Sequence, residues 1–290
     1  MSTTTPPAAA DTSRAAELVA RLDALGTLPE VTTRINALVN DPDSDPDELE
    51  QVIRHDPALV ARVMKVVNSA HYGLNKVTSI KRAIVLLGFG TINRVAMAAS
   101  MGQLFRGKLS ARHSAKDLWN HCIAVGAVAR DLAAKVQPAM AEEAFLAGIS
   151  HDLGMVALLQ LMPKELAAVC DAAEKDSRGF CEIERAVIGV DHEQLGAALS
   201  AAWGFPASCQ SAASYHHRPA ESDAENRLIV EMVHVADTLC CGERIGFSLT
   251  AHRQSVPPML ATRFGLDTDA WDSTQQRVAA LAYAATTIFG

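Results

Sequence analysis

A histidine-aspartate pair, His151-Asp152, lies in the middle of the most apolar segment of the chain. The segment, EEAFLAGISHDLGMVALLQLM over residues 142–162, is apolar on every side of a helix, so we predict that it passes through the protein core. A buried imidazole or carboxylate without a partner costs several kcal/mol. The fold must therefore bring further polar side chains to this point.

The rest of the sequence predicts an all-α protein. Of its 290 residues 49% are hydrophobic but only 5% are aromatic, and Val and Ile seldom alternate with polar residues. This composition favours packed helices over sheets. Residues 57–68 and 114–135 follow helical patterns, and Pro163 and Gly204 follow apolar runs at points where a helix would end. We expect a large helical core.

Two other predicted helices each place a polar residue on an apolar face. His121 lies in LWNHCIAVGAVAR and Asp237 lies in VEMVHVADTLCC. Helices that direct His and Asp side chains into one core supply the donors that a metal site requires. The same groups are equally explained as hydrogen-bonded core residues without an ion, and the sequence leaves both interpretations open.

The order of these residues resembles the H…HD…D pattern of the HD superfamily, whose members bind divalent metal and often hydrolyse phosphoesters. Three further histidines resemble those of the branch that binds two metal ions. The resemblance thus implies a ligand set of His121, His151, Asp152, Asp237, His192, His216 and His217, which would hold a divalent ion (Fe, Mn, Mg or Zn) or none. In an active site, Asp152 would be the catalytic residue, because it could bridge the ions or orient a water acidified by them.

The local sequence gives the additional histidines a simpler interpretation. His192 follows Asp191 at the start of a helix and is expected to be exposed there. His216 and His217 lie near a helix end, where at most one of them is expected to face inward. His234 lies one turn before Asp237 and is expected only to flank the site.

A longer resemblance is more specific. The segments IRHDPALVARVMKVVNSAHYGLNKVTSIKRAIVLLGFGTINRVAM, AFLAGISHDLGMVALLQL and GVDHEQLGAALSAAWGFPASCQSAASYHHRP are similar to the HDOD family, the HD-related output domain of bacterial signalling proteins. Together with the segment around His121 they cover roughly residues 28–237. The chain is identified as a member of this family.

The family resemblance implies a two-lobed helical bundle in which a helical N-terminal part packs on a modified HD-type core. We expect a disordered lead over residues 1–13, a helical subdomain over 14–110, an HD-like subdomain over 111–245 and a helical extension over 246–290 that packs on the HD half. The implied role is that of a bacterial signalling output or adaptor protein, commonly near receiver or cyclic di-GMP modules. Enzyme activity is generally not established for such domains.

Two departures weigh against the phosphodiesterase activity of the related HD-GYP branch. Met155 stands where that branch places a lysine that could hold a phosphate, and RPAESDAENRL follows His216-His217 in place of a Gly-Tyr-Pro segment. Cyclic dinucleotide hydrolysis is therefore not expected. Our preferred interpretation is a non-catalytic protein that acts through protein contacts, and the alternative is a metal-dependent phosphohydrolase acting on a nucleotide or related phosphoester.

The charge distribution is uneven. Residues 57–116 contain ten Arg and Lys but no Asp or Glu, although the net charge of the chain is −7. Such a stretch could attract an anion or an acidic partner, and the candidate residues are Lys76, Lys81, Arg82 and Arg94. The simpler interpretation is that it contacts acidic segments of its own chain. Nucleic-acid binding is the weakest candidate function, because no nucleic-acid-binding motif is present.

The sequence predicts a cytoplasmic protein. Its longest apolar stretches, 83–105 and 144–162, are interrupted by polar residues and are not predicted to cross a membrane. The N-terminus, MSTTTPPAAADTS, lacks the basic start and apolar region of a signal peptide. The six cysteines never form C-x-x-C and several lie in apolar runs, which indicates reduced, buried thiols. The oligomeric state is not predicted.

Overall fold

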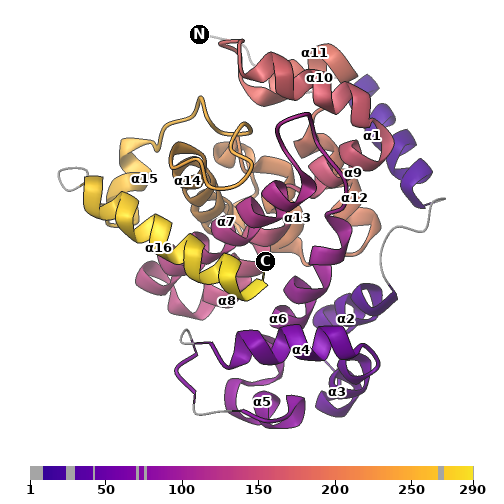
Figure 1. Cartoon of the computed structure of the whole chain (residues 1–290), viewed down its shortest axis with the longest axis vertical. Helices are drawn as coiled ribbons and strands as arrows, with labels where there is room; N and C mark the ends of the chain where they lie inside the picture. Colours follow the sequence, from indigo (N-terminus) through magenta and orange to yellow (C-terminus); the bar gives the residue numbers. More distant parts are fainter. Residues whose placement is uncertain are drawn as a thin grey trace.

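The computed structural model describes residues 9–23, 30–41, 43–69, 72–74, 77–266 and 271–289. Within these ranges the regular structure is helical apart from one isolated bridge between Lys108 and Ser114, so the all-α prediction is confirmed (Figure 1). The helices are α1 (Ala9–Asp23), α2 (Glu30–Asn40), α3 (Pro46–Arg54), α4 (Pro57–Val67), α5 (Ile80–Leu87), α6 (Phe89–Met101), α7 (Ala115–Val136), α8 (Ala141–Ser150), α9 (Leu153–Leu161), α10 (Pro163–Ala173), α11 (Phe180–Ile188), α12 (His192–Ala202), α13 (Ala207–Tyr215), α14 (Arg227–Gly242), α15 (Pro258–Arg263) and α16 (Trp271–Phe289).

The helices form two lobes. Helices α2 to α6 gather at one end of the molecule, and α7 to α14 build the larger lobe (Figure 1). Helix α6 joins the two, because it packs against α2, α4 and α5 on one side and against α8 on the other. The C-terminal helix α16 lies along α7 and also contacts α4 and α14, so it touches both lobes.

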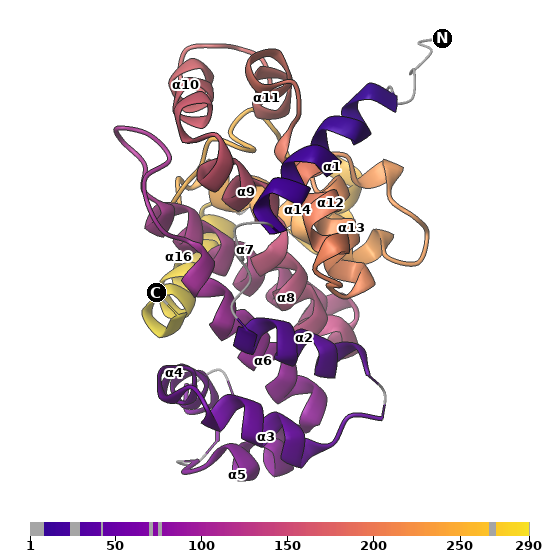
Figure 2. The same ribbon diagram turned by 90° about the vertical axis from the view of Figure 1, so that its right-hand side faces the viewer.

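The first helix differs from the prediction. Residues 1–13 were expected to be a disordered lead, but α1 begins at Ala9, and residues 1–8 lie outside the described part of the chain. The alanines at its start have high helix propensity, and Ala15, Leu18 and Val19 are buried. Helix α1 packs on α9 and α12 of the larger lobe rather than on the N-terminal helices (Figure 2). The subdomain boundary at residue 110 remains a prediction.

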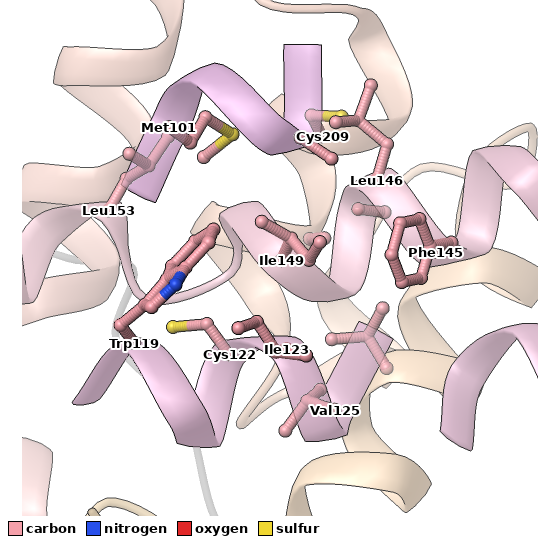
Figure 3. Packing of buried hydrophobic residues seen from close by; sticks show 14 of the residues in the cluster. Met101, Trp119, Cys122, Ile123, Val125, Phe145, Leu146, Ile149, Leu153 and Cys209 are labelled. Atoms are coloured by element: carbon pink, nitrogen blue, oxygen red, sulfur yellow. The ribbon is translucent and has the colours of Figure 1, made fainter. Parts of the chain in front are cut away.

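The centre of the larger lobe is the contact between α7 and α8. Side chains that include Trp119, Ile123, Phe145 and Ile149 interdigitate there (Figure 3). A Cβ atom on Gly148 would lie 2.6 Å from the Cα atom of Gly126, so the two helices approach at backbone distance and only glycine fits. This close crossing brings α7 next to the His151-Asp152 turn.

The apolar segment around His151-Asp152 was predicted as one helix, and this prediction is wrong in detail. Helix α8 ends at Ser150 and α9 begins at Leu153, with Asp152 at φ −95° and ψ 24° between them. The turn directs both polar side chains into the lobe. The stretch Pro138–Leu161, which contains α8 and α9, is long and apolar enough to cross a membrane. However, 89% of its most apolar part is buried inside the protein, as is typical of helices in a protein core.

A buried amide links the two lobes. Asn36 of α2 is 5% exposed, and its Nδ2 atom donates to the carbonyl oxygens of Trp203 at 2.6 Å and Gly204 at 2.9 Å, at the end of α12.

We expect Asn36→Ala to lower the free energy of unfolding by about 0.5–1.5 kcal/mol, because it removes the donor to the half-buried carbonyl oxygen of Trp203. The carbonyl oxygen of Gly204 keeps its hydrogen bond from Nδ2 of Asn40 at 2.6 Å. Urea denaturation checks this value. The exposed Arg34 on the same helix is the matched control, and Arg34→Ala should change stability by no more than about 0.5 kcal/mol. Equal effects of the two substitutions would contradict the proposed link.

Candidate metal centre

The seven residues of the predicted ligand set meet at one interior point of the larger lobe. They come from α7 (His121), the α8–α9 turn (His151 and Asp152), the start of α12 (His192), the turn after α13 (His216 and His217) and α14 (Asp237). Six of the side chains are completely buried, and that of His217 is 5% exposed. Segments more than 100 residues apart in sequence therefore supply a single cluster.

Asp152 lies at the centre of the cluster. Its Oδ2 atom is 3.3 Å from Nε2 of His151, and its Oδ1 atom is 3.6 Å from Nε2 of His192 and 3.7 Å from Nε2 of His216. Neither oxygen has a hydrogen-bond partner among the described residues. Because an unpaired buried carboxylate is costly, this position is suited to a cation.

Asp237 occupies the other side of the cluster. Its Oδ1 atom lies 3.1 Å from Nε2 of His121, and its Oδ2 atom lies 3.8 Å from Nδ1 of His217. That second oxygen, like Nε2 of His151, has no hydrogen-bond partner in the described structure. The two aspartates thus contact different imidazoles of one cluster.

The donors form several groups of three that could each hold an ion. Their ligand atoms lie within 4.8 Å of one another in three sets: His121, His151 and Asp237; Asp152, His192 and His216; and His216, His217 and Asp237. Imidazole and carboxylate donors suit Zn, Fe and Mn, whereas Mg prefers oxygen ligands. Seven donors exceed what one tetrahedral ion needs, so the residues fit one or two divalent ions.

The outward-facing nitrogens fix most of the rings. In three rings Nδ1–H donates to a backbone carbonyl oxygen. His121 donates to Ile245 at 3.3 Å, His151 donates to Gly148 at 2.7 Å, and His216 donates to Ala212 at 2.9 Å. In His192 the corresponding acceptor is Glu184, and Nδ1 of His217 accepts from the side-chain amide of Gln254. Four rings are therefore held with Nε2 directed into the cluster, as metal-ligating histidines usually are.

The start of α12 explains the position of His192. Asp191 caps the helix by accepting from the backbone N of Gln194 at 2.8 Å, which places His192 in the first turn. Gly154 on α9 lets α12 approach, because a Cβ atom there would lie 1.9 Å from the carbonyl oxygen of His192. The expectation that His192 is exposed was wrong, since it did not include this contact between α9 and α12.

His216 and His217 both face the cluster, which corrects the prediction that at most one of them would. Their Nε2 atoms lie 3.3 Å and 3.0 Å from Nε2 of His192. Glu193 holds this turn, because its Oε1 atom accepts from the backbone N of His217 at 2.9 Å and its Oε2 atom accepts from Nε of Arg218 at 2.8 Å. His234 donates from Nδ1 to the carbonyl oxygen of His216 at 2.7 Å, so it supports the site from outside.

The protonation states of several groups suit metal binding. Burial raises the pKa of Asp152, but His151 and the other nearby imidazoles outweigh burial and hold this pKa well below its usual range. Burial also raises the pKa of Asp237, but the contact with His121 outweighs burial and lowers this pKa to about 2. Burial and neighbouring imidazoles lower the pKa of His216, and they lower that of His217 to about 4. Ionised carboxylates and neutral imidazoles are the forms that bind metal. Burial lowers the pKa of His151 and His192, but Asp152 and Glu184 outweigh burial and raise these two pKa values, so ion binding at these rings is coupled to proton release.

No contact among the described residues joins the basic candidate residues to this cluster. Lys81 is exposed in the first turn of α5 and pairs with Asp47 at 3.4 Å, and Arg82 is exposed beside it. Arg94 is half-buried on α6, and Lys76 lies outside the described residues. The pairing of Lys81 with Asp47, and of Arg62 with Asp56 at 3.7 Å, agrees with contacts between the basic stretch and acidic segments of its own chain.

Sequence reasoning missed the groups that support the histidines. The sequence did not identify three supporting side chains, those of Glu184, Glu193 and Gln254. Ile245 could not be identified by its residue type, because its contact with His121 is made by a backbone oxygen. Glu184 lies eight residues before His192, on a different helix, so no helical spacing connects them. A carboxylate within an otherwise apolar helix face was the available signal for Glu184.

The fold and the donor arrangement define an HD-type helical domain. The chain belongs to the HDOD family, because the family model for the HDOD domain matches residues 25–219, more than half of the chain. Asp237 and the segments that follow it lie beyond this match. The HDOD prediction is thus confirmed, and the candidate metal centre includes residues from outside the matched region.

Known proteins resemble the chain over most of its length. An HDOD domain protein of unknown function from Geobacter sulfurreducens has 25% sequence identity and a TM-score of 0.77, with 96% of this chain and 99% of that chain covered. A candidate signal transduction protein from Marinobacter aquaeolei VT8 has 24% identity and a TM-score of 0.75, with 97% and 65% covered. An uncharacterized protein of Treponema pallidum (strain Nichols) is 25% identical over 228 residues, which are 78% of this chain and 44% of the relative. The chain thus spans less than half the length of this curated relative.

Proposed function

We propose that the protein is a bacterial signalling output domain that acts through contacts with other proteins, and that its HD core binds divalent ions without turning over a substrate. The observation that carries this proposal is the closure of the site. The seven donor side chains have at most 5% exposure, and the segment after α14 covers them through Ile245 and Gln254. A buried centre of this kind stabilises a fold more readily than it admits a phosphoester.

The chemistry beside the donors supports the same proposal. Among the described residues, Asp152 and Asp237 form ion pairs only with histidines. Met155, completely buried on α9, occupies the position at which a lysine would serve a phosphate group. Besides a metal ion, a phosphoryl-transfer site normally supplies Arg or Lys for the transferred group, and no Arg or Lys in the described part of the chain pairs with these carboxylates.

The contact surface that we propose for a partner is the outer face of α5. Val85 is 68% exposed and Leu86 is 42% exposed, and Lys81 and Arg82 lie one turn earlier on the same helix. This combination suits an acidic protein such as a receiver module or a cyclic di-GMP signalling module. We also infer a cytoplasmic location, since all six cysteines are free and five of them are buried, as expected of a reducing compartment.

A metal-dependent phosphohydrolase is the second candidate. It is favoured by the two oxygens of Asp152 that lack hydrogen-bond partners, because such a carboxylate can bind an ion or orient a water molecule. A bound ion would supply Lewis acidity, Asp152 and the histidines would hold it, and Gln254 would have to leave His217 for a substrate to enter.

The two functions are separated by loading the full chain with Mn²⁺, Fe²⁺ or Zn²⁺ and assaying phosphatase and phosphodiesterase activity. We expect bound metal by elemental analysis, no turnover, and no effect of inorganic phosphate on the absorption spectrum of the Co²⁺ form. Turnover that disappears in Asp152→Ala would overturn the non-catalytic proposal and support the hydrolase. Absence of bound metal under all conditions would overturn the metal centre itself.

A further inference from the structure

Glu184 is a buried carboxylate that contacts one of the histidines of the cluster. It lies on α11 and is completely buried. Its Oε2 atom accepts from Nδ1–H of His192 at 2.6 Å and from the backbone N of the same residue at 3.1 Å. Its Oε1 atom has no hydrogen-bond partner among the described residues. Glu184 therefore directs its interactions at His192.

This arrangement differs from that of the other rings. His121, His151 and His216 donate from Nδ1 to backbone carbonyl oxygens, which are neutral acceptors. His216 also lies near Glu193, but at 4.0 Å, beyond hydrogen-bond distance. Of the five rings, His192 is thus the one whose Nδ1 is bonded to a carboxylate.

A purely structural role does not require a carboxylate at this position. Burying a charge costs several kcal/mol unless it is well paired, and among the described residues the ion-pair partner of Glu184 is His192 rather than a lysine or arginine. A neutral amide could accept the same two hydrogen bonds at a lower desolvation cost. The charge is explained if His192 carries a cation on its opposite nitrogen.

We propose that Glu184 is a positioning residue for a metal ion bound at His192. By accepting Nδ1–H it leaves Nε2 as the free nitrogen, which faces Oδ1 of Asp152 at 3.6 Å and Nε2 of His216 at 3.3 Å. Its charge makes the ring a stronger donor, as carboxylates behind metal-bound histidines do. This inference rests on the proposed metal centre, and it extends the centre to a residue on α11.

The test compares Glu184→Gln with wild type in the full chain. Gln keeps the size and an acceptor oxygen but removes the charge. We expect the affinity for Co²⁺ and Mn²⁺, measured by titration and chelator competition, to fall about 10–100-fold, and the visible absorption of the Co²⁺ form to shift. The urea midpoint of the metal-free protein should change little. Glu182→Gln, an exposed position on the same helix, is the matched control and should leave the affinity unchanged.

A double-mutant cycle with His192→Ala separates positioning from a general effect on folding. If Glu184 acts through His192, Glu184→Gln should have no further effect on ion affinity once the ring is absent. The same loss in both backgrounds, or wild-type affinity and spectrum in Glu184→Gln, would overturn the proposal. Failure of the wild type to bind either ion would instead contradict the metal centre, so the two failures are distinguishable.

Discussion

Adding Mn²⁺ or Co²⁺ to the metal-free protein is expected to raise its melting temperature by about 10 °C, and Asp152→Asn is expected to remove most of this rise. A ligand that binds only the folded state at about 1,000 times its dissociation constant stabilises that state by about 4 kcal/mol. For a chain of this size, each kcal/mol corresponds to roughly 2–4 °C. Thermal unfolding followed by circular dichroism, with the ion and then with EDTA, measures the effect.

Asp152 is the residue to change because it belongs to more than one donor group. It lies within reach of Cys122 and His151 on one side and of His192 and His216 on the other, and neither of its oxygens is hydrogen-bonded. Asn offers a single neutral oxygen, so it binds a cation far more weakly than a carboxylate does.

The matched control is Asp171→Asn, since Asp171 is exposed on α10. This variant should show the full rise in melting temperature. A rise in Asp152→Asn as large as in wild type would mean that the ion binds elsewhere, and no rise in wild type with either ion would contradict the metal centre.

Local patterns were sufficient to predict four of the seven residues of the cluster, whereas His192, His216 and His217 were included because of the family resemblance. His121 and Asp237 were recognisable because each interrupts an apolar helix face, and His151-Asp152 because an apolar helix cannot bury them unpaired. Because each of these four side chains would be costly to bury without a partner, the sequence also predicted that they lie together. The structure brings them together, with Nε2 of His121 3.1 Å from Oδ1 of Asp237.

Long-range contacts explain what the sequence did not predict. The burial of His192 depends on Gly154 of α9, and a one-dimensional pattern does not show that these helices touch. The contacts from Ile245 and Gln254 come from the segment after α14, where a backbone oxygen and a single amide carry no periodic signal. Similarly, α1 packs on the larger lobe, although its sequence position suggested the N-terminal one.

The close contact between α9 and α12 gives the second large prediction. Gly154→Ala is expected to lower the free energy of unfolding by about 3 kcal/mol, at the upper end of the usual cost of overpacking. The added Cβ atom would lie 1.9 Å from the carbonyl oxygen of His192 and 2.8 Å from the backbone N of Gly196. Backbone atoms cannot rotate away as side chains do, so the helices must separate.

Separation of these helices also affects the candidate metal centre. Asp152 lies two residues before Gly154, and His192 is the first residue of α12, so the substitution moves the two donors apart. We expect weaker Co²⁺ binding together with the loss of stability. Urea denaturation of the metal-free protein and a Co²⁺ titration at a temperature where the variant remains folded measure the two effects separately.

Gly242→Ala is the matched control for this substitution. Gly242 is the last residue of α14, and apart from its chain neighbours and the backbone of its own helix no described atom lies within 4 Å of the position that its Cβ would occupy. Because Ala favours a helix over Gly by up to about 1 kcal/mol, this variant should be as stable as wild type or slightly more stable, with unchanged ion affinity. If Gly154→Ala behaved in the same way, α12 could not lie as close to α9 as the structure places it, and the position of His192 in the cluster would have to be revised.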